Sequence, residues 1–389
     1  MIDTIVLVLN KNMFTITEPD KFEPTARKIL EDSGYMGSRG YLKCAQNPTP
    51  KELKSGIYKP RLTLTQRINR DGRREPSLKI ELSLPKLIYG NNFDELQDSD
   101  FEIVTEKLNK TLKDMGVLVF MQILVSAPVS AVHYSKNIPL TDGSTPHYVI
   151  NKIKEAGVNL ALDVNQTDYR NDGSCYRWHC NSYEIAFYDK LKDLMVARKS
   201  EKRAIEKDNS LQLNLFERLT DKPIFEVLRM EVRLNKRQKI KQLLNSLNIE
   251  TESSFQNLFN ASVSKCVLFH YLDQIEDHRN VLSNYKMTTD KDFLVHLVTN
   301  NLALGAAKSL QIFGLKKALE TITLRELRTI FYKISNQSRY RMTNVANNLS
   351  LQAFPSPLIS IREVINDFKP LHIGEYSKEL LNNDKYRYN

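Results

Sequence analysis

Two short segments of the chain carry residue types that could cut a phosphodiester bond. Residues 183–190 read Tyr-Glu-Ile-Ala-Phe-Tyr-Asp-Lys, and residues 228–234 read Leu-Arg-Met-Glu-Val-Arg-Leu. The hydroxyl of Tyr188 could attack a DNA phosphate and hold the strand as a phosphotyrosine. The carboxylate of Glu231 could hold a divalent ion while the arginines on either side of it clamp the phosphate.

Both segments alternate as strands do, and strand alternation places the polar residues of each on one face. In the first segment the apolar residues point to a core and Tyr188 points away. In the second, one face is apolar and the other carries a row of Arg229, Glu231 and Arg233. Two simpler interpretations stay open: Tyr188 is one strand tyrosine among seventeen, and the row is an exposed, salt-bridged face of a sheet.

Other residues could join Glu231 around a metal ion. Asp3 opens the first strand and His133 lies in a strand-like segment, so either side chain could coordinate Mg²⁺ or Mn²⁺. Taken singly, each also fits a structural polar group. The run from Cys175 to Cys180 contains a histidine, but no CxxC pair completes a zinc site.

The composition favours an anionic partner. The 389 residues carry a net charge of +10, which is typical of proteins that bind nucleic acid, although a merely basic enzyme would show it too. Four scattered cysteines do not make a disulfide scaffold. The apolar stretch over residues 117–125 is too short to span a bilayer, and the N-terminal residues resemble a buried strand rather than a signal peptide. We therefore expect no membrane partner and a cytoplasmic location.

The chain changes character near residue 248. Before it, alternating segments such as 59–68 and 77–84 predict strands, and after it helical periodicity takes over. The expected fold class is α+β, with a curved and mostly antiparallel sheet. We predict a catalytic nicking domain over residues 1–248 and a smaller helical domain over residues 249–389, which binds DNA or a partner protein.

Basic residues gather at places that could contact DNA. An Asp-Gly pair between the two alternating segments predicts a hairpin with an arginine-rich tip, and such a ribbon can enter a groove or clasp a phosphate backbone. Residues 324–342 resemble a helix-turn-helix, although an ordinary helical hairpin fits equally well. The DNA-binding candidates are Arg67, Arg70, Arg73 and Arg74 at the hairpin, Arg339 and Arg341 at the second motif, and Lys190, Lys236 and Arg237 beside the two strand segments.

Three absent motifs narrow the function further. The sequence has no GxxxxGK[ST], so it carries no P-loop ATPase, and no GxGxxG before a helix, as a dinucleotide site would need. It also lacks the His-hydrophobe-His pair that marks the commonest tyrosine nicking enzymes.

Taken together, these residues resemble the filamentous-phage gene II replication initiators, the II/X type of phages and plasmids. The likeness begins at Met1-Ile2-Asp3 and continues through residues 79–92, which end in a Gly-Asn-Asn turn. The family's Tyr-x-Lys-x-x-x-Leu-like segment falls on residues 186–194, and its Arg-Phe-Glu-Ala-Arg-like strand falls on residues 229–233. With a further match near residues 354–369, the resemblance covers nearly the whole chain. A looser likeness extends to plasmid rolling-circle initiators.

The resemblance implies a rolling-circle replication initiator that nicks and rejoins one DNA strand at an origin. Tyr188 takes the place of the family's nicking tyrosine, with a divalent metal near Glu231 and charge neutralisation by Arg229 or Arg233. Unwinding would come from a host helicase in a bacterial cytoplasm, since the chain has no ATPase motif.

One departure from the family pattern concerns the metal. The family shows an Arg-Ile-Asp segment where this chain has Ala131-Val132-His133, so a histidine replaces the expected acidic ligand. Imidazole suits Mn²⁺ better than Mg²⁺. Either His133 takes the role of the acidic ligand, or another carboxylate such as Asp3 or Glu81 does. The departure also supports an alternative function, a non-catalytic origin-binding or regulatory protein built on the same scaffold.

Overall fold

A computed structural model describes most of the chain. The described residues are 1–31, 42–49, 51–52, 55, 57–68, 74–140, 144–155, 167–170, 174–193, 226–277, 290–322, 324–331 and 357–372. No described helix has the length and apolar character that a membrane span requires.

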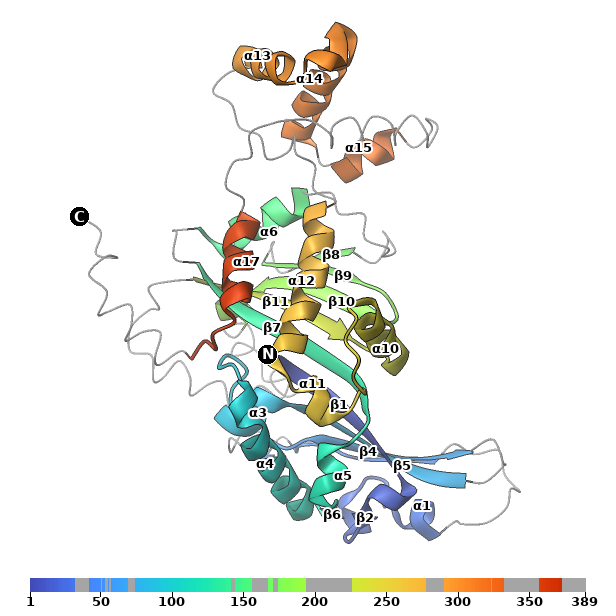
Figure 1. Ribbon diagram of the computed structural model, residues 1–389. Helices are drawn as coiled ribbons and strands as arrows, with labels where there is room; N and C mark the ends of the chain where they lie inside the picture. The colour runs from blue at the N-terminus through green and yellow to red at the C-terminus, as the bar shows by residue number, and fades with distance from the viewer. Residues whose placement is uncertain are drawn as a thin grey trace, which may run out of the picture.

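The centre of the fold is a nine-stranded sheet in which every neighbouring pair is antiparallel (Figure 1). The large antiparallel sheet predicted from the alternating segments is therefore confirmed. From one edge to the other, its strands are β3 (Leu42–Gln46), β4 (Arg61–Ile68), β5 (Arg74–Ser83), β1 (Ile2–Asn10), β7 (Val129–Leu140), β11 (Glu226–Leu234), β10 (Tyr183–Asp189), β9 (Cys175–His179) and β8 (Thr167–Arg170). A two-stranded sheet pairs β2 (Thr15–Ile16) with β6 (Val117–Leu118).

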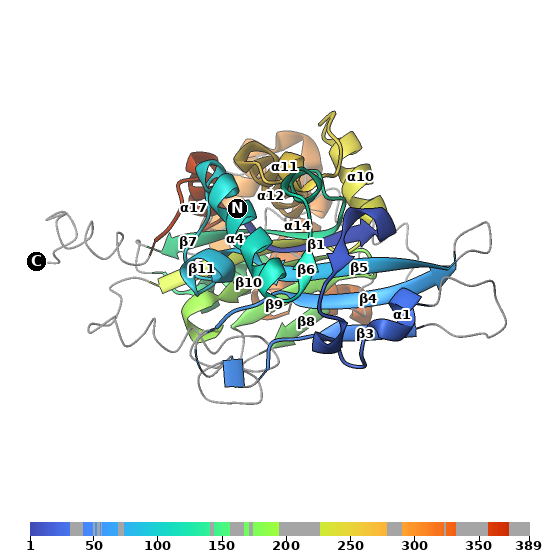
Figure 2. The ribbon, with the colours of Figure 1, turned by 90° about the horizontal axis from the view of Figure 1, so that it is seen from below.

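Helices gather on one side of the large sheet (Figure 2). Strand alternation explains this arrangement, because the apolar residues of β11, such as Met230 and Val232, are fully buried in the core that the helices share with the sheet. The helices on this side include α4 (Phe101–Asp114), α10 (Arg237–Ser246), α11 (Phe255–Leu258), α12 (Ala261–Asp277) and α17 (Pro357–Asp367). Shorter helices occur at α1 (Arg27–Glu31), α3 (Leu84–Tyr89), α5 (Met121–Val125) and α6 (Pro146–Glu155).

The described residues form two hydrophobic clusters of very different size. The large one contains the sheet together with α10, α11, α12 and α17, so the core continues across residue 248. The small one joins α13 (Asp290–Asn300), α14 (Gly305–Thr321) and α15 (Leu324–Ile330), which stand apart from the sheet (Figure 1). The division at residue 248 into a nicking and a binding domain stays a prediction.

The predicted hairpin exists as the pair β4 and β5, with Arg61 opposite Glu81. Its tip lies outside the described residues, as do Arg70 and Arg73. The strands include the backbones of Arg67 and Arg74, whose side chains are not described. Of the predicted helix-turn-helix only α15 is described, so Arg339 and Arg341 also lie outside the described part of the chain.

A buried carboxylate joins three distant segments of the chain. Glu95 forms an ion pair with Lys136 on β7, and it accepts backbone hydrogen bonds from Asn137 at 2.7 Å and Leu371 at 2.9 Å. Burial would raise the pKa of Glu95, but the charges of Lys136 and the N-terminus, together with the hydrogen bonds from Lys136 and Asn137, outweigh it, so the pKa lies below its usual value. This network ties the segment after α17 to the centre of the sheet.

Replacing Glu95 with Gln should lower the free energy of unfolding by about 3–5 kcal/mol, because Lys136 would keep a buried charge without a counterion. Urea unfolding at neutral pH measures this loss. The double variant Glu95→Gln/Lys136→Met removes both charges and should recover part of it. An equal loss in the double variant would mean that the backbone hydrogen bonds, rather than the charge pair, are what matters.

Candidate active site

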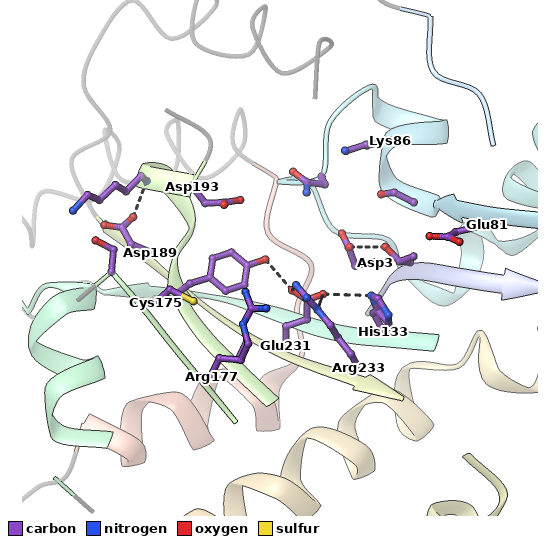
Figure 3. A pocket seen from close by; sticks show the side chains of 17 residues that line it. Asp3, Glu81, Lys86, His133, Cys175, Arg177, Asp189, Asp193, Glu231 and Arg233 are labelled. Atoms are coloured by element: carbon purple, nitrogen blue, oxygen red, sulfur yellow. Dashed lines mark hydrogen bonds and ion pairs between the residues drawn. The ribbon is translucent and has the colours of Figure 1, made fainter. Parts of the chain in front are cut away.

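The side of the sheet opposite to the helices carries a polar cavity of about 490 Å³ (Figure 3). Side chains from β1, β5, β7, β9, β10 and β11 line it, so residues that are far apart in sequence meet here because their strands are neighbours. Tyr188, Glu231, Arg233, His133 and Asp3, all predicted from the sequence, are among them.

Tyr188 and Glu231 meet through the register of β10 and β11. Ala186 lies directly opposite Glu231, and Tyr188 lies directly opposite Arg229. Because alanine ends at Cβ, the side chain of Glu231 has room to reach diagonally toward the tyrosine. The phenol oxygen of Tyr188 donates a hydrogen bond of 2.9 Å to Oε2 of Glu231.

Glu231 is also held by Arg233 from the same strand. The Nε of Arg233 donates to Oε1 at 3.0 Å and its Nη2 donates to Oε2 at 3.1 Å. Burial would raise the pKa of Glu231, but the guanidinium groups of Arg233 and Arg229 hold it well below its usual range. The carboxylate is therefore ionised at neutral pH and can only accept hydrogen bonds.

The tyrosine hydroxyl keeps its proton at neutral pH. Tyr188 is half-buried, and burial together with the negative charge of Glu231 raises its pKa well above the ordinary value of 10. A nucleophilic attack by this oxygen needs a proton acceptor, and the nearest carboxylate is already within hydrogen-bond reach.

A second carboxylate, missed from the sequence, extends the charge network. Glu184 lies 2.9 Å from Nη1 of Arg233 and 3.2 Å from Nε of Arg177 on β9. Alternation could have identified Glu184, because it shares a strand face with Tyr188. Arg177 joins the site because it lies opposite Ala186 in the β9–β10 ladder. The ladder itself was not visible in the sequence.

Asp3 reaches the cavity because β1 contains a bulge. Ile2 pairs with Tyr134 and Thr4 pairs with the next residue back, His133, which leaves Asp3 as an extra residue on its strand. A bulge re-aims a side chain that regular alternation would send to the other face. Asp3 and Thr4 therefore both line the cavity, and the Thr4 hydroxyl donates to Asp3 at 2.9 Å.

Arg229 lies beneath the cavity rather than in it. The side chain is 2% exposed, and its Nη2 donates to Asp3 at 2.8 Å and to Ser135 at 2.7 Å. Its Nη1 donates to the backbone oxygen of Asn92 at 2.6 Å. The expectation that Arg229 clamps a phosphate therefore does not match this placement, since its donors are directed to interior partners. Arg233 lines the cavity and retains that role as a prediction.

His133 is neutral at physiological pH. Burial and the Arg233 guanidinium lower its pKa below the ordinary value of 6.5. Its Nδ1 lies 3.7 Å from Oε1 of Glu231, a distance that carries little attraction while the imidazole is uncharged.

The three predicted metal ligands do not form a metal site as they lie. Arg233 and Tyr188 donate to the oxygens of Glu231, and Arg229 and Thr4 donate to those of Asp3. Among the described residues, no three His, Cys, Asp or Glu side chains are grouped closely enough to hold an ion. The divalent ion stays a prediction from the sequence.

Lys190 is an interior residue. The expectation of a DNA contact does not match its placement, because the side chain is fully buried and its Nζ donates to Oδ1 of Asn92 at 3.0 Å. Burial, with the nearby Arg229 guanidinium, lowers the pKa of Lys190 to about 7. Lys236 and Arg237 are exposed where β11 leads into α10.

Comparison with known proteins adds no neighbour. No family model, no curated protein and no solved structure matches the chain. The likeness to gene II initiators therefore rests on the sequence motifs and stays a prediction. The geometry of the Tyr188 cavity is therefore the basis for its proposed chemistry.

Replacing Lys190 with Met should change how stability depends on pH. The pKa of Lys190 lies below the ordinary 10.5, so the unfolded chain binds more protons than the folded protein between about pH 7 and pH 10.5. In the parent this makes the free energy of unfolding rise with pH across that window. The free energy of unfolding of the parent, minus that of the variant, should therefore rise by on the order of 1 kcal/mol per pH unit.

Denaturant unfolding at several pH values between neutral and mildly alkaline measures this trend. Lys192→Met is the matched control, because Lys192 is exposed in the same turn. A parallel pH dependence for the parent and the Lys190 variant would mean that the buried amine keeps an ordinary pKa.

Proposed function

We propose that this protein nicks and rejoins one strand of DNA, as an initiator of rolling-circle replication, with Tyr188 as the nucleophile. The observation that carries the proposal is the hydrogen bond of 2.9 Å from the Tyr188 hydroxyl to Glu231, in a cavity that Arg233 also lines. A nucleophile, a proton acceptor and a phosphate-binding cation are thereby within reach of one reacting group.

The proposed reaction exchanges one phosphodiester for another. Oη of Tyr188 attacks the phosphorus as its proton moves to Glu231, and a bond forms between the tyrosine oxygen and the 5′-phosphate. The bond from phosphorus to the 3′-oxygen breaks, and that oxygen takes up a proton from water while Glu231 returns the tyrosine proton to the solvent, so that no net proton is gained or lost. Arg233 offsets the negative charge that develops on the phosphate oxygens. The reverse transfer joins the held 5′-phosphate to a 3′-hydroxyl and closes the strand.

The biological setting follows from the proposed chemistry. The free 3′-hydroxyl would prime synthesis at a replication origin in a bacterial cytoplasm. A host helicase would unwind the duplex, since the sequence has no P-loop. To bind a divalent ion, Glu231 or Asp3 would have to give up its hydrogen bonds from an arginine and coordinate the metal instead. Comparing the nicking rate in excess EDTA, in Mg²⁺ and in Mn²⁺ measures whether that exchange occurs.

One observation favours a second candidate, a DNA-binding protein without nicking activity. The raised pKa of Tyr188 and the four hydrogen-bonded carboxylate oxygens would suit a purely structural polar cluster. The two candidates differ in a single measurement, the transfer of a labelled DNA strand to the protein.

Tyr188→Phe should abolish nicking and leave DNA binding within a few-fold of the parent, because only the nucleophilic oxygen is removed. The first measurement is the relaxation of a supercoiled plasmid that carries the replication origin of the phage or plasmid encoding the protein. The second is a gel shift that detects the transfer of a labelled DNA strand to the protein. Tyr183→Phe is the matched control, since Tyr183 stacks on Tyr271 in the core. Full-rate nicking by the Tyr188 variant would rule out this nucleophile.

Glu231→Gln should lower the nicking rate by about 10²–10⁴-fold, because an amide does not take the phenol proton. Single-turnover kinetics on an intact oligonucleotide that contains the nick site would measure the loss, with the melting temperature as a check on folding. If the melting temperature falls while the rate per folded molecule is retained, Glu231 acts only as the partner of Arg233.

A further inference from the structure

A second cavity lies beside α10, the helix that follows β11. Its volume is about 420 Å³, and it is lined by α10, by the end of α5 and by residues 251–254. The helix packs on the side of β7 and β11 that carries the apolar residues, so this cavity and the Tyr188 cavity are on opposite sides of the sheet. The proposed nicking chemistry makes no use of it.

Positive charge runs along the helix face that borders the second cavity. Arg237 and Lys241 are exposed, lie four residues apart and therefore project from the same face of α10. The helix has no acidic residue in its first turn and no side-chain cap at Lys236, so its first backbone N–H groups add a partial positive charge. One carboxylate, that of the exposed Glu252, lines the same cavity.

The opposite wall supplies hydroxyl groups. Ser126, Thr251, Ser253 and Ser254 line the cavity. Ser253 is 5% exposed, and within the described residues its Oγ is buried without a hydrogen-bond partner. A buried polar atom without a hydrogen-bond partner costs free energy. The Oγ of Ser253 therefore calls for a ligand or a bridging water in this cavity.

We propose that this second cavity binds the phosphate backbone of duplex DNA. Cations, helix N–H groups and hydroxyls are the groups that contact backbone phosphates in protein–DNA complexes. Among the described residues that line the cavity none is aromatic, so it lacks the stacking platforms that are typical of single-strand sites. The contact is therefore sequence-independent, and it would hold the duplex while the other side of the sheet acts on one strand. The proposal rests on DNA being the partner, but not on Tyr188 being a nucleophile.

The double variant Arg237→Ala/Lys241→Ala tests the site in the full-length protein. Binding to a fluorescent random-sequence duplex should weaken by on the order of tenfold at low salt, and the log–log salt slope should fall by roughly 1–2 units. The matched control is Lys107→Ala/Lys110→Ala, which removes two exposed lysines from α4 and should change binding less.

The outcomes separate this proposal from the proposed function. If the parent binds and nicks DNA, but the α10 variant binds duplex with the same affinity and salt slope as the parent, the second site is wrong and the nicking activity stands. If the parent binds duplex without nicking, and the α10 variant alone weakens that binding, the second site stands without the enzyme. If inorganic phosphate at matched ionic strength stabilises the parent but not the variant, while duplex affinity is equal, the cavity takes a small anion and the duplex proposal is wrong.

Discussion

The site depends on one buried guanidinium. Arg229 lies near the middle of the sheet with almost no exposure, and a charge in such a place is costly unless it is paired and hydrogen-bonded. Its partners come from three other segments: Asp3 on β1, Ser135 on β7 and the backbone of Asn92 after α3. Pairing the two Nη groups of Arg229 therefore fixes the position of the strands that form the floor of the cavity, while its Nε is buried without a hydrogen-bond partner among the described residues. Removing it would leave Asp3 buried without its cation, so its contribution is to the geometry of the site rather than to contact with a phosphate.

Much of the site could be predicted because β-strands alternate with a period of two. The polar row on β11 and the outward position of Tyr188 follow directly from spacing, and both lie where alternation places them. The hairpin of β4 and β5 was also predictable, since its two strands are adjacent in the sequence and an Asp-Gly pair lies between them in the sequence. Local patterns determine these features, and a single sequence contains such patterns.

The rest depends on contacts between segments that are far apart in the sequence. The pairing of β7 with β11 joins residues about ninety positions apart, and nothing local specifies it. Asp3 owes its direction to a bulge whose partner strand is β7. Lys190 was predicted to contact DNA, but the chain leaves the strand after Asp189 and the amine turns toward Asn92. Each of these three features depends on tertiary structure, which alternation does not encode.

The charges of the cavity suggest how binding a phosphate would change the tyrosine. Arg233 is shared between Glu231 and Glu184, and it is the more exposed of the two β11 arginines. A phosphate that pairs with Arg233 would compete with both carboxylates for the same donors. Glu184 would retain Arg177, whereas Glu231 would lose the cation that does most to keep its pKa low. With its pKa nearer the usual range, Glu231 would become a better acceptor for the Tyr188 proton. On the proposed function, the substrate itself therefore activates the nucleophile, and the resting protein keeps the phenol protonated until DNA is in place.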